Sequence, residues 1–348
     1  MLPLISICLP NLNTRPFLEE RMETLLAQTF GDWELIVSDN YSDDGSWELF
    51  QKFKDDPRIH LFQAPRAGMY ANWNECVRRA RGGYVYMATS DDTARPDLLE
   101  RLVAPLERMP YIHLAMCDFD AIDENSKPWD PPMQQWQIAF YKEWLTTPSV
   151  RNGRTEFLLH ACFGPTWHTM TSVLIRRSLL EKTGLFRTDC GSIADYDWDL
   201  RASLATDIAF VPGRLATWRV REGQATVKVF GPKFHRDMLA VLESVLHDPN
   251  AGIPTHWRNI PNWDREIVDA RRKAYWNSFR LWRRAMLDNT SGIAESVRNA
   301  LRLEPGLLMR QVCRGFAWSE SFRVDPVGRA AGLIRVFDAA WPPQPLPS

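Results

Sequence analysis

Residues 82–97 have the sequence Gly-Gly-Tyr-Val-Tyr-Met-Ala-Thr-Ser-Asp-Asp-Thr-Ala-Arg-Pro-Asp, an apolar run that passes directly into two adjacent acids, Asp91 and Asp92. The apolar part predicts a buried strand. In open α/β sheets, ligands bind outside the carboxyl ends of the strands, and Mg²⁺ or Mn²⁺ is held by a few carboxylates together with substrate phosphates. The pair therefore predicts a cation site, and the alternative is a cap for the helix that follows.

The rest of the first hundred residues alternates predicted strands and helices. Strands are expected at 4–9, 33–38, 59–62 and 84–88, and helices at 17–27, 46–53 and 68–81. This alternation predicts an α/β fold in which a mostly parallel sheet is covered by helices on both faces. The carboxyl ends of the strands should then lie along one edge and form one ligand site.

The chain beyond residue 115 has a looser pattern. Four prolines interrupt 116–163, which is expected to form loops and short elements over a cleft. A strand is expected at 171–175, helices at 177–183 and 194–205, and two paired short strands at 207–211 and 216–220. From about 229 onward the composition predicts helices, with the clearest apolar stripe in 264–286.

Composition narrows the class of protein. With 348 residues and 45% hydrophobic content, the chain can bury a large core. A net charge of −1 and the lack of a basic tract argue against nucleic-acid binding. Six cysteines without CxxC spacing fit the reduced thiols of a cytoplasmic protein. The N-terminus predicts a strand rather than a signal peptide, and no apolar run is long enough to predict a membrane-spanning helix.

One segment combines basic and aromatic residues. Between Arg258 and Arg284 there are eight Lys or Arg residues, with four tryptophans interleaved from Trp257 onward. A solvated helix face is one interpretation. The other is peripheral contact of residues 257–284 with an anionic membrane, at its inner, cytoplasmic face, or with a partner.

Polar residues follow the other predicted strands. Asp39 ends the second strand, where a carboxylate can accept a hydrogen bond from a base N–H or a ribose hydroxyl; a turn is the alternative. The loop Pro10-Asn11-Leu12-Asn13 follows the first strand, and Arg66 with Gly68 precedes a helix. Backbone groups near helix starts, or the guanidinium, could hold phosphate.

A second acidic cluster, Asp195-Tyr196-Asp197-Trp198-Asp199, opens the helix expected at 194–205. The helix dipole favours the ionised form of Asp195 at this position. An ionised carboxylate at the edge of a cleft can act as a general base toward an attacking hydroxyl. The alternative is a first-turn acid without chemistry, and Asp197 and Asp199 are assigned to that alternative.

Taken in order, these motifs resemble the inverting GT-A glycosyltransferases of family 2 over about residues 1–228. The matching stretches are Ile5-Ser6-Ile7-Cys8-Leu9-Pro10 with Asn13, Gln28-Thr29-Phe30, Trp33 to Asp39, Ser42-Asp43-Asp44-Gly45-Ser46, Gly68 with Asn72 or Asn74, Ala80 and Gly82, Thr89-Ser90-Asp91-Asp92, Gly184-Leu185-Phe186, Ala194-Asp195-Tyr196-Asp197 and Trp218-Arg219-Val220-Arg221. The resemblance implies a GT-A domain at 1–228, with a nucleotide-sugar half at 1–115 and an acceptor and catalytic half at 116–228. Residues 229–348 would form a C-terminal helical region.

The resemblance also implies roles for particular residues. Asp39 would contact the base, Asp91 and Asp92 would hold Mn²⁺ or Mg²⁺ with the diphosphate, and Asp195 would be the catalytic base. The other donor-site residues would be Pro10, Asn11, Asn13, Arg66, Gly68, Arg219 and Arg221. The donor would be a nucleotide-diphosphate sugar, with a UDP-sugar favoured. The acceptor would be a glycan, a lipid-linked sugar or another hydroxyl compound, as in bacterial surface glycan assembly.

Two departures from the family pattern bear on the metal. Thr89-Ser90 stand where the motif often carries an earlier acid, and Arg221 stands where a His is often found. A guanidinium is a poor metal ligand but binds diphosphate well, so Arg219 or Arg221 could take over part of the cation's role.

Two other classes of protein share parts of this sequence pattern. A nucleotidyltransferase would need a Gly-rich, basic phosphate loop after the first strand, and the loop at 10–13 is not one. A non-catalytic protein would bind a nucleotide sugar but would have no transfer activity for a change at Asp195 to abolish.

Overall fold

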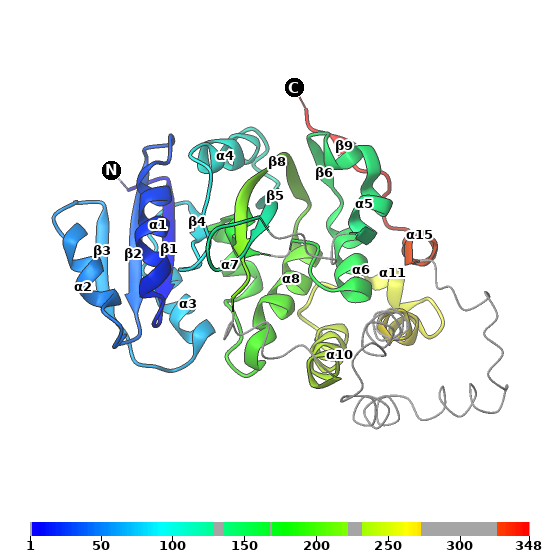
Figure 1. The fold of residues 1–348 in the computed structure, drawn as a ribbon. Coiled ribbons are helices and arrows are strands. Elements are labelled where there is room, and N and C mark those ends of the chain that lie inside the picture. The colour runs from blue at the N-terminus through cyan, green and yellow to red at the C-terminus, as the bar shows by residue number, and fades with distance from the viewer. Residues whose placement is uncertain (1, 129–134, 168, 222–231, 273–325, 348) are drawn as a thin grey trace, which may run out of the picture.

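The computed structural model describes residues 2–128, 135–167, 169–221, 232–272 and 326–347. Within them, nine strands form one sheet in the order β3-β2-β1-β4-β7-β5-β8-β6-β9 (Figure 1). The strands are β1 Ile5–Asn11, β2 Trp33–Asp39, β3 Ile59–Gln63, β4 Tyr84–Met87, β5 Leu114–Ile122, β6 Ser149–Arg151, β7 Val173–Arg176, β8 Ile208–Arg219 and β9 Gln344–Pro345. The helices are α1 Arg15–Leu26, α2 Ser46–Phe50, α3 Met69–Arg79, α4 Leu98–Arg108, α5 Gln135–Tyr141, α6 Gly153–Phe163, α7 Arg177–Thr183, α8 Ala194–Ala205, α10 Pro232–His247, α11 Thr255–Arg258 and α15 Pro326–Val336.

The N-terminal part of the sheet is parallel, as predicted. β1 pairs with β2 and β4, and β2 pairs with β3, all in parallel. The register sets Asn11 opposite Asp39 and Asp39 opposite Gln63, so three strands end level with one another. β7 enters antiparallel between β4 and β5. Polar side chains at the ends of β1, β2 and β3 therefore meet at one edge.

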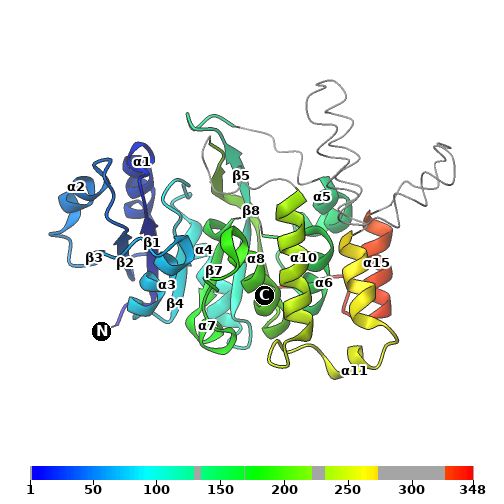
Figure 2. The same ribbon diagram turned by 90° about the horizontal axis from the view of Figure 1, so that it is seen from below.

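Helices cover both faces of the sheet, and α1 and α3 lie on opposite sides of it (Figure 2). Alternate residues of β1 point to the two faces, since successive side chains of a strand do so. Ile5, Ile7 and Leu9 pack in one apolar cluster with α1 and α4, whereas Cys8 packs in another with α3, α7 and α8. Burial on both faces explains why β1 is apolar throughout rather than alternating.

The expectation of loops and short elements over 116–163 holds for the described residues between β5 and α6, where α5 and β6 are short, but it was wrong at both ends. β5 is a nine-residue strand inside the sheet, and α6 is an almost wholly buried helix. The four prolines that suggested irregular structure fall in sequence between these two elements. These prolines lie between regular elements, where the missing N–H donor of a proline does not interrupt a helix or a strand.

The two paired short strands expected at 207–211 and 216–220 are also wrong, because they form the single strand β8. β8 runs parallel to β5, and Cys117 pairs with Val211 while the next residue of β5 pairs with Arg214. Pro212 and Gly213 thus have no partner on β5 and form a bulge, in which Gly213 has a φ of 120°. A bulge accommodates a proline that cannot donate to the ladder.

The C-terminal helices share a core with α6 and α8. α10, a helix at 263–272 and α15 pack against α6 and α8 in one apolar cluster. β9 pairs with β6 at the edge of the sheet. Trp257 is fully buried and Arg271 is 4% exposed, whereas Arg258 and Arg265 are exposed, so the first part of the basic and aromatic segment has a buried side and a solvent side. Residues 273–284 of that segment lie outside the described residues.

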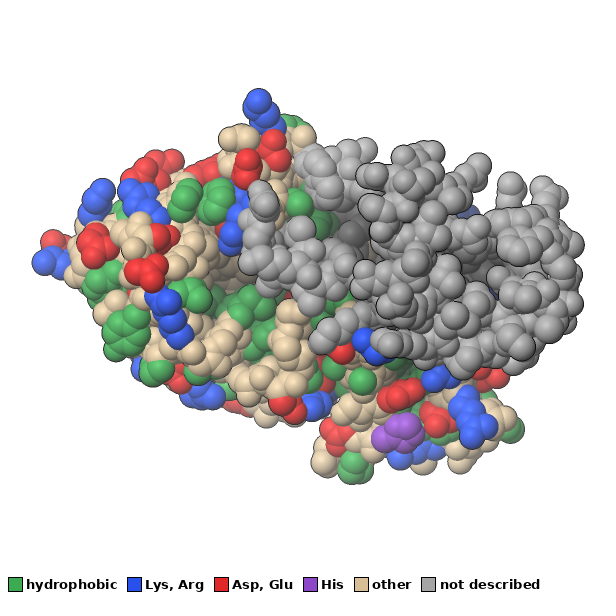
Figure 3. Space-filling view, turned by 60° about the horizontal axis from the view of Figure 1, so that its bottom comes forward, with side chains coloured by type: hydrophobic (Ala, Val, Ile, Leu, Met, Phe, Trp, Pro, Cys, Tyr) green, Lys and Arg blue, Asp and Glu red, His purple; other side chains and the backbone are tan. Residues whose placement is uncertain are grey.

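The surface and the cysteines agree with the composition. Basic and acidic side chains are interspersed over the described part of the face in Figure 3 rather than gathered by sign. Cys8, Cys76, Cys117, Cys162 and Cys190 are free thiols, and Cys313 lies outside the described residues. None of the described helices is both long and apolar enough to cross a membrane.

Close packing at the start of α6 gives a first prediction. A Cβ at Gly153 would overlap the backbone carbonyl oxygens of Ser203 and Thr206, which cannot rotate away. We expect Gly153→Ala to lower the free energy of unfolding by about 3 kcal/mol, measured by urea denaturation. The control is Gly332→Ala in α15, where nothing lies within 4 Å of the added carbon, and a gain of up to about 1 kcal/mol is expected. Equal stability of the two variants would contradict this packing.

Candidate active site

The carboxyl end of β2 carries Asp39, which is fully buried. Its Oδ1 accepts hydrogen bonds from Asn11 Nδ2 at 2.7 Å and from Ser42 Oγ at 2.6 Å. Its Oδ2 accepts from the Ser42 N–H at 2.9 Å and from Gln63 Nε2 at 3.3 Å. Asp39 therefore fixes the ends of three strands, as the turn interpretation expects. Any contact with a base would have to share this carboxylate with those donors.

Two loops beside this edge are joined by side-chain hydrogen bonds. Asn13, at φ 52°, donates from Nδ2 to Asp43 at 2.8 Å and accepts the Asp43 N–H at 3.0 Å. Arg66 donates to the carbonyls of Asn40 at 2.9 Å and Tyr41 at 2.5 Å, and its Nη2 is 3.1 Å from Asp43 Oδ2. The exposed guanidinium of Arg66 thus borders the loop that follows β2.

Gly68 immediately precedes α3 at φ 107°, a conformation that favours glycine. No described atom lies within 4 Å of the place where its Cβ would stand, so a ligand could approach this backbone closely. α3 is tied to the strand ends by Asn72, whose Nδ2 donates to the carbonyls of Asn11 at 3.2 Å and Ser38 at 3.0 Å. Pro10 is buried within β1.

Asp92 is 2% exposed and fully engaged with the protein. Its Oδ2 accepts from the hydroxyls of Thr89 at 2.5 Å, Thr169 at 3.1 Å and Thr171 at 2.9 Å. Its Oδ1 accepts the backbone N–H of Arg219 at 2.8 Å. Burial, followed by the neighbouring charge of Asp91, raises the pKa of Asp92 to about 6. Its oxygens hold together segments that are far apart in the sequence.

Asp91 has different surroundings. Its side chain is 13% exposed, and Oδ2 lies 2.9 Å from Nε of Arg221. The Asp91 carbonyl accepts from Nε of Arg219 at 2.6 Å. The Arg219 guanidinium is buried: Nη2 pairs with Glu20 at 2.6 Å and Nη1 bonds to the turn at 123–126. Of the two arginines, Arg221 is therefore the more accessible, and Arg219 holds the backbone at Asp91.

Asp195 lies in the first turn of α8, where the sequence pattern placed it. Its Oδ1 accepts the Tyr196 N–H at 2.8 Å. Burial raises the pKa of Asp195, and this hydrogen bond and the Tyr70 hydroxyl oppose the rise. Tyr70 also donates to the carbonyl of Ser192 at 3.2 Å. Because Tyr70 and Asn72 both belong to α3, this helix connects the start of α8 to the strand ends that carry Asp39.

The other two acids of this cluster are structural. Asp197 pairs with Arg201 at 2.6 Å, and Asp199 accepts a hydrogen bond from Trp167 Nε1 at 2.6 Å. Both carboxylates are buried. Neither is available to an acceptor, which agrees with the interpretation from the sequence.

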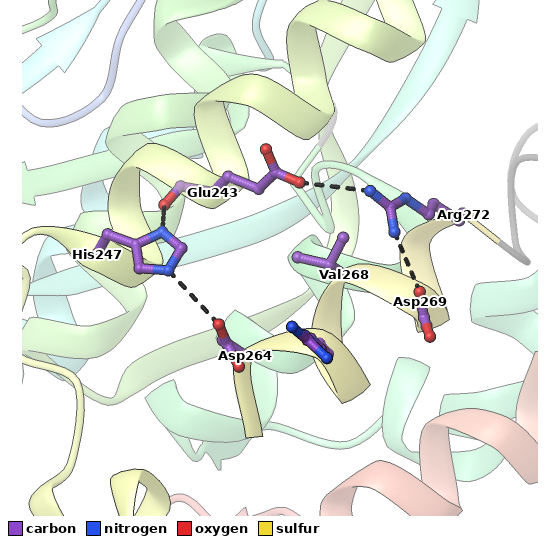
Figure 4. Close-up of a pocket in the computed structure, with 7 residues that line it drawn as sticks. Glu243, His247, Asp264, Val268, Asp269 and Arg272 are labelled. Atoms are coloured by element: carbon purple, nitrogen blue, oxygen red, sulfur yellow. Dashed lines mark hydrogen bonds and ion pairs between the residues drawn. The ribbon is translucent and has the colours of Figure 1, made fainter. Parts of the chain in front are cut away.

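A pocket of about 340 Å³ lies elsewhere, between α10 and the helix at 263–272 (Figure 4). Its charged groups pair with one another: Glu243 is 3.6 Å from Arg272, which is 3.3 Å from Asp269, and His247 is 3.5 Å from Asp264. It contains no residue that the sequence assigned to a site.

Several residues around the site escaped the sequence analysis. They are Glu20, Tyr70, Thr169 and Thr171. No local pattern distinguishes them, since each acts across a separation that only the fold closes. Thr89, two residues before Asp91, belongs to the motif quoted from the sequence.

The α/β sheet, with an acid paired to an arginine at its carboxyl edge and a further acid at a helix start, has the arrangement expected of a GT-A glycosyltransferase. Residues 6–182, just over half of the chain, match Glycosyl transferase family 2. The chain belongs to this family.

Three similar proteins, two of them named as glycosyltransferases, match parts of the chain. "Uncharacterized protein MT1568" of Mycobacterium tuberculosis is 28% identical over 77% of this chain and 84% of its own length. The uncharacterized glycosyltransferase EpsJ of Bacillus subtilis is 28% identical over 58% of this chain and 56% of its own. The putative teichuronic acid biosynthesis glycosyltransferase TuaG of B. subtilis is 35% identical over 28% of this chain and 40% of its own.

Two solved structures share the fold. S. aureus TarS 1-349 in complex with UDP-GlcNAc superposes with a TM-score of 0.60 at 16% identity, over 80% of this chain and 73% of the other. The mannosyltransferase PcManGT of Pyrobaculum calidifontis, in complex with GDP-Man and Mn²⁺, has a TM-score of 0.54 at 16% identity, over 98% and 89%.

Proposed function

We propose that this glycosyltransferase moves a sugar from a nucleotide-diphosphate sugar to an acceptor hydroxyl with inversion of the anomeric carbon. Arg221, and Asp91 through a divalent cation, would hold the diphosphate, and Asp195 would act as the general base. The observation that carries the proposal is the contrast between adjacent acids: Asp92 is sealed by protein hydrogen bonds, whereas Asp91 is accessible and paired with Arg221.

The donor would lie along the carboxyl edge of β1, β2 and β4. The open backbone at Gly68 suits close approach of the nucleotide. Asp39, with Asn11 behind it and the Asn13 loop beside it, would border the base and ribose, and Arg66 lies next to them. Arg221 would supply a planar donor to the diphosphate. Arg219, whose guanidinium is buried, would act by positioning Asp91.

The residues present fit a divalent cation held mainly by the substrate. Among the described residues, no group of three or more His, Cys, Asp or Glu side chains is placed to hold a metal ion. Mg²⁺ is commonly bound through one or two carboxylates plus substrate phosphates, and Asp91 offers one such carboxylate. When bound, Mn²⁺ or Mg²⁺ would neutralise charge on the departing diphosphate. Arg221 would share that role.

Asp195 would remove the proton from the acceptor hydroxyl. A carboxylate in partly buried surroundings has a raised pKa, which makes it a stronger base than an exposed one. The attacking oxygen would approach the anomeric carbon from the side opposite the diphosphate. A single displacement of this kind inverts the configuration and forms no covalent bond to the enzyme.

The names of the relatives support a substrate class. TuaG is described as acting in teichuronic acid biosynthesis, and TarS was solved with UDP-GlcNAc. We therefore propose a UDP-sugar donor and an acceptor in bacterial surface glycan assembly, either a glycan or a lipid-linked sugar. The enzyme would act in the cytoplasm at the inner face of the membrane. Trp257 does not support direct membrane contact, because it is buried.

A screen for donor binding tests this function. UDP-, GDP-, dTDP- and CMP-sugars are added to the protein with and without Mn²⁺, and thermal unfolding is followed. At a concentration of 100 times its Kd, the true donor should stabilise the fold by about 2.7 kcal/mol, and Mn²⁺ should increase the effect of UDP-sugars. If no nucleotide raises the melting temperature under either condition, the proposed donor class is wrong.

A further inference from the structure

The segment 184–193 joins α7 to α8 and leads to Asp195, and α3 fixes its first part. Asn74 of α3 is 3% exposed, and its side-chain amide bonds to the backbone of Phe186 twice. Nδ2 donates to the Phe186 carbonyl at 2.7 Å, and Oδ1 accepts the Phe186 N–H at 3.1 Å. Phe186 also packs with residues of α3 and α8 in one apolar cluster. Because a fully satisfied buried amide restricts movement, this part of the segment is held against α3.

Tyr70, one turn before Asn74 in α3, contacts both parts of the same segment. Its ring stacks on that of Phe186, with the ring centroids 6.1 Å apart and an angle of 26° between the planes. Its hydroxyl donates to the Ser192 carbonyl at 3.2 Å, three residues before Asp195 in the chain. Residues four apart lie on one face of a helix, so Tyr70 and Asn74 act on the segment together. The start of α8 is therefore placed by α3.

The hydroxyl of Tyr70 also interacts with the carboxylate of Asp195. Burial raises the pKa of Asp195, and the hydrogen bond from Tyr70 opposes this rise. Burial, followed by the charge of Asp195, raises the pKa of Tyr70 well above 10, so the hydroxyl keeps its proton and donates it. One donor thus has two acceptors, the Ser192 carbonyl and the Asp195 carboxylate. The carboxylate is the stronger acceptor while it is ionised.

We propose that Tyr70 is a positioning residue that holds the ionised carboxylate of Asp195 in place for proton transfer from the acceptor. This role rests on the proposed function, in which Asp195 is the base. In the transfer step, the proton of the acceptor hydroxyl moves to Asp195, the acceptor oxygen bonds to the anomeric carbon, and the diphosphate leaves with the electron pair of its bond. Tyr70 keeps its own proton and turns it to the Ser192 carbonyl, so its buried donor is not left without an acceptor.

Removal of the hydroxyl tests this role, because Tyr70→Phe keeps the ring that stacks on Phe186. In steady-state transfer assays kcat should fall by about tenfold or more, since a charge-assisted hydrogen bond is lost, and the Kd of the donor should not change. In a chain that already carries Asp195→Asn, adding Tyr70→Phe should cause little further loss, because residues that act as a unit are not additive. An equal loss in both backgrounds would overturn the proposal.

Tyr84→Phe is the matched control. Tyr84 lies on β4, is 1% exposed, and donates from its hydroxyl to Glu107. This variant also loses a buried hydroxyl that bonds to a carboxylate, yet it should leave kcat unchanged. If kcat fell as far in Tyr84→Phe as in Tyr70→Phe, a general loss of stability would explain both and the proposal would be wrong.

The pKa of Asp195 gives a readout that needs no substrate. Carbon NMR shifts of the aspartate carboxyl groups, assigned with Asp195→Asn, are followed against pH in the unmodified chain and in both tyrosine variants. Asp199 of α8, whose pKa is raised by burial and then by the charge of Asp195, is followed in the same titration. Tyr70→Phe should raise the pKa of Asp195, since the ionised form loses a donor, and should move the acid limb of the transfer profile to higher pH. Tyr84→Phe should change neither.

The two readouts separate this role from the proposed function. An unchanged pKa of Asp195 in Tyr70→Phe would overturn the role of Tyr70 and leave the proposed function intact. Full transfer by Asp195→Asn would overturn the proposed base, and the role of Tyr70 with it.

Discussion

Replacing Asp195 with Asn is expected to lower kcat by about 10²–10⁴-fold and to leave nucleotide-sugar affinity unchanged. The amide has nearly the same shape and can still accept the Tyr196 N–H that the carboxylate accepts at 2.8 Å. It cannot take a proton from the acceptor hydroxyl. Steady-state transfer rates together with donor binding by calorimetry separate the loss of a base from the loss of a binding group.

The pH dependence of transfer gives a second readout for Asp195. The base must be ionised to act, and burial raises its pKa above the ordinary value of 3.8. Activity should therefore fall as the pH falls through a pKa higher than that of an exposed aspartate, and Asp195→Asn should abolish this limb of the profile. Asp189→Asn, a change of an exposed acid at the nearby surface, is the control and should change neither readout. Full transfer by Asp195→Asn would assign the base elsewhere.

Asp91→Ala and Asp92→Ala are expected to affect different quantities: the first donor binding, the second the stability of the fold. Asp91→Ala should weaken Mn²⁺-dependent nucleotide-sugar binding by at least about tenfold, since even outer-shell changes at metal sites cost 10–100-fold. Its melting temperature should fall less than that of Asp92→Ala, because it loses one ion pair, with Arg221, whereas Asp92→Ala leaves several donors without an acceptor. Asp92→Ala should instead lower the free energy of unfolding by about 2–4 kcal/mol, since it leaves the Arg219 N–H and three buried hydroxyls without their acceptor.

Urea denaturation and calorimetric titration of the donor, with and without Mn²⁺, measure the two effects. Asp120→Ala is the control, because it removes an acid from an exposed pair with Arg214 at 2.8 Å and should change neither quantity. The assignment of Asp91 would be wrong if Asp92→Ala remained stable and lost metal-dependent binding while Asp91→Ala kept it.

The sequence predicted elements well where a local signal marks both ends. α7 and α8 match the expected 177–183 and 194–205 to the residue, and Gly184 at φ 77° ends α7. The prediction was wrong where residues that usually end a strand lie inside a longer one. Pro212 and Gly213 suggested two strands, yet a bulge against β5 lets one strand pass through them.

The site itself could be predicted only in part. Asp91, Asp92 and Asp195 became candidates because each adjoins a predictable strand or helix end. The distinction between Asp91 and Asp92 could not be found, since it depends on Thr169, Thr171 and Arg219, which lie far along the chain. Burial of the Arg219 guanidinium is likewise invisible in sequence, because its partner Glu20 is about two hundred residues away.

The hydrogen bonds of Asp92 make one carboxylate the link between three segments of the chain. Its partners come from the end of β4, from the segment before β7 and from the end of β8. An in-line displacement requires the attacking and departing oxygens to be held on opposite sides of one carbon. Under the proposed mechanism, Asp92 would help to fix the position of Asp91 relative to β7 and β8, because it bonds to the backbone of Arg219 and to Thr171.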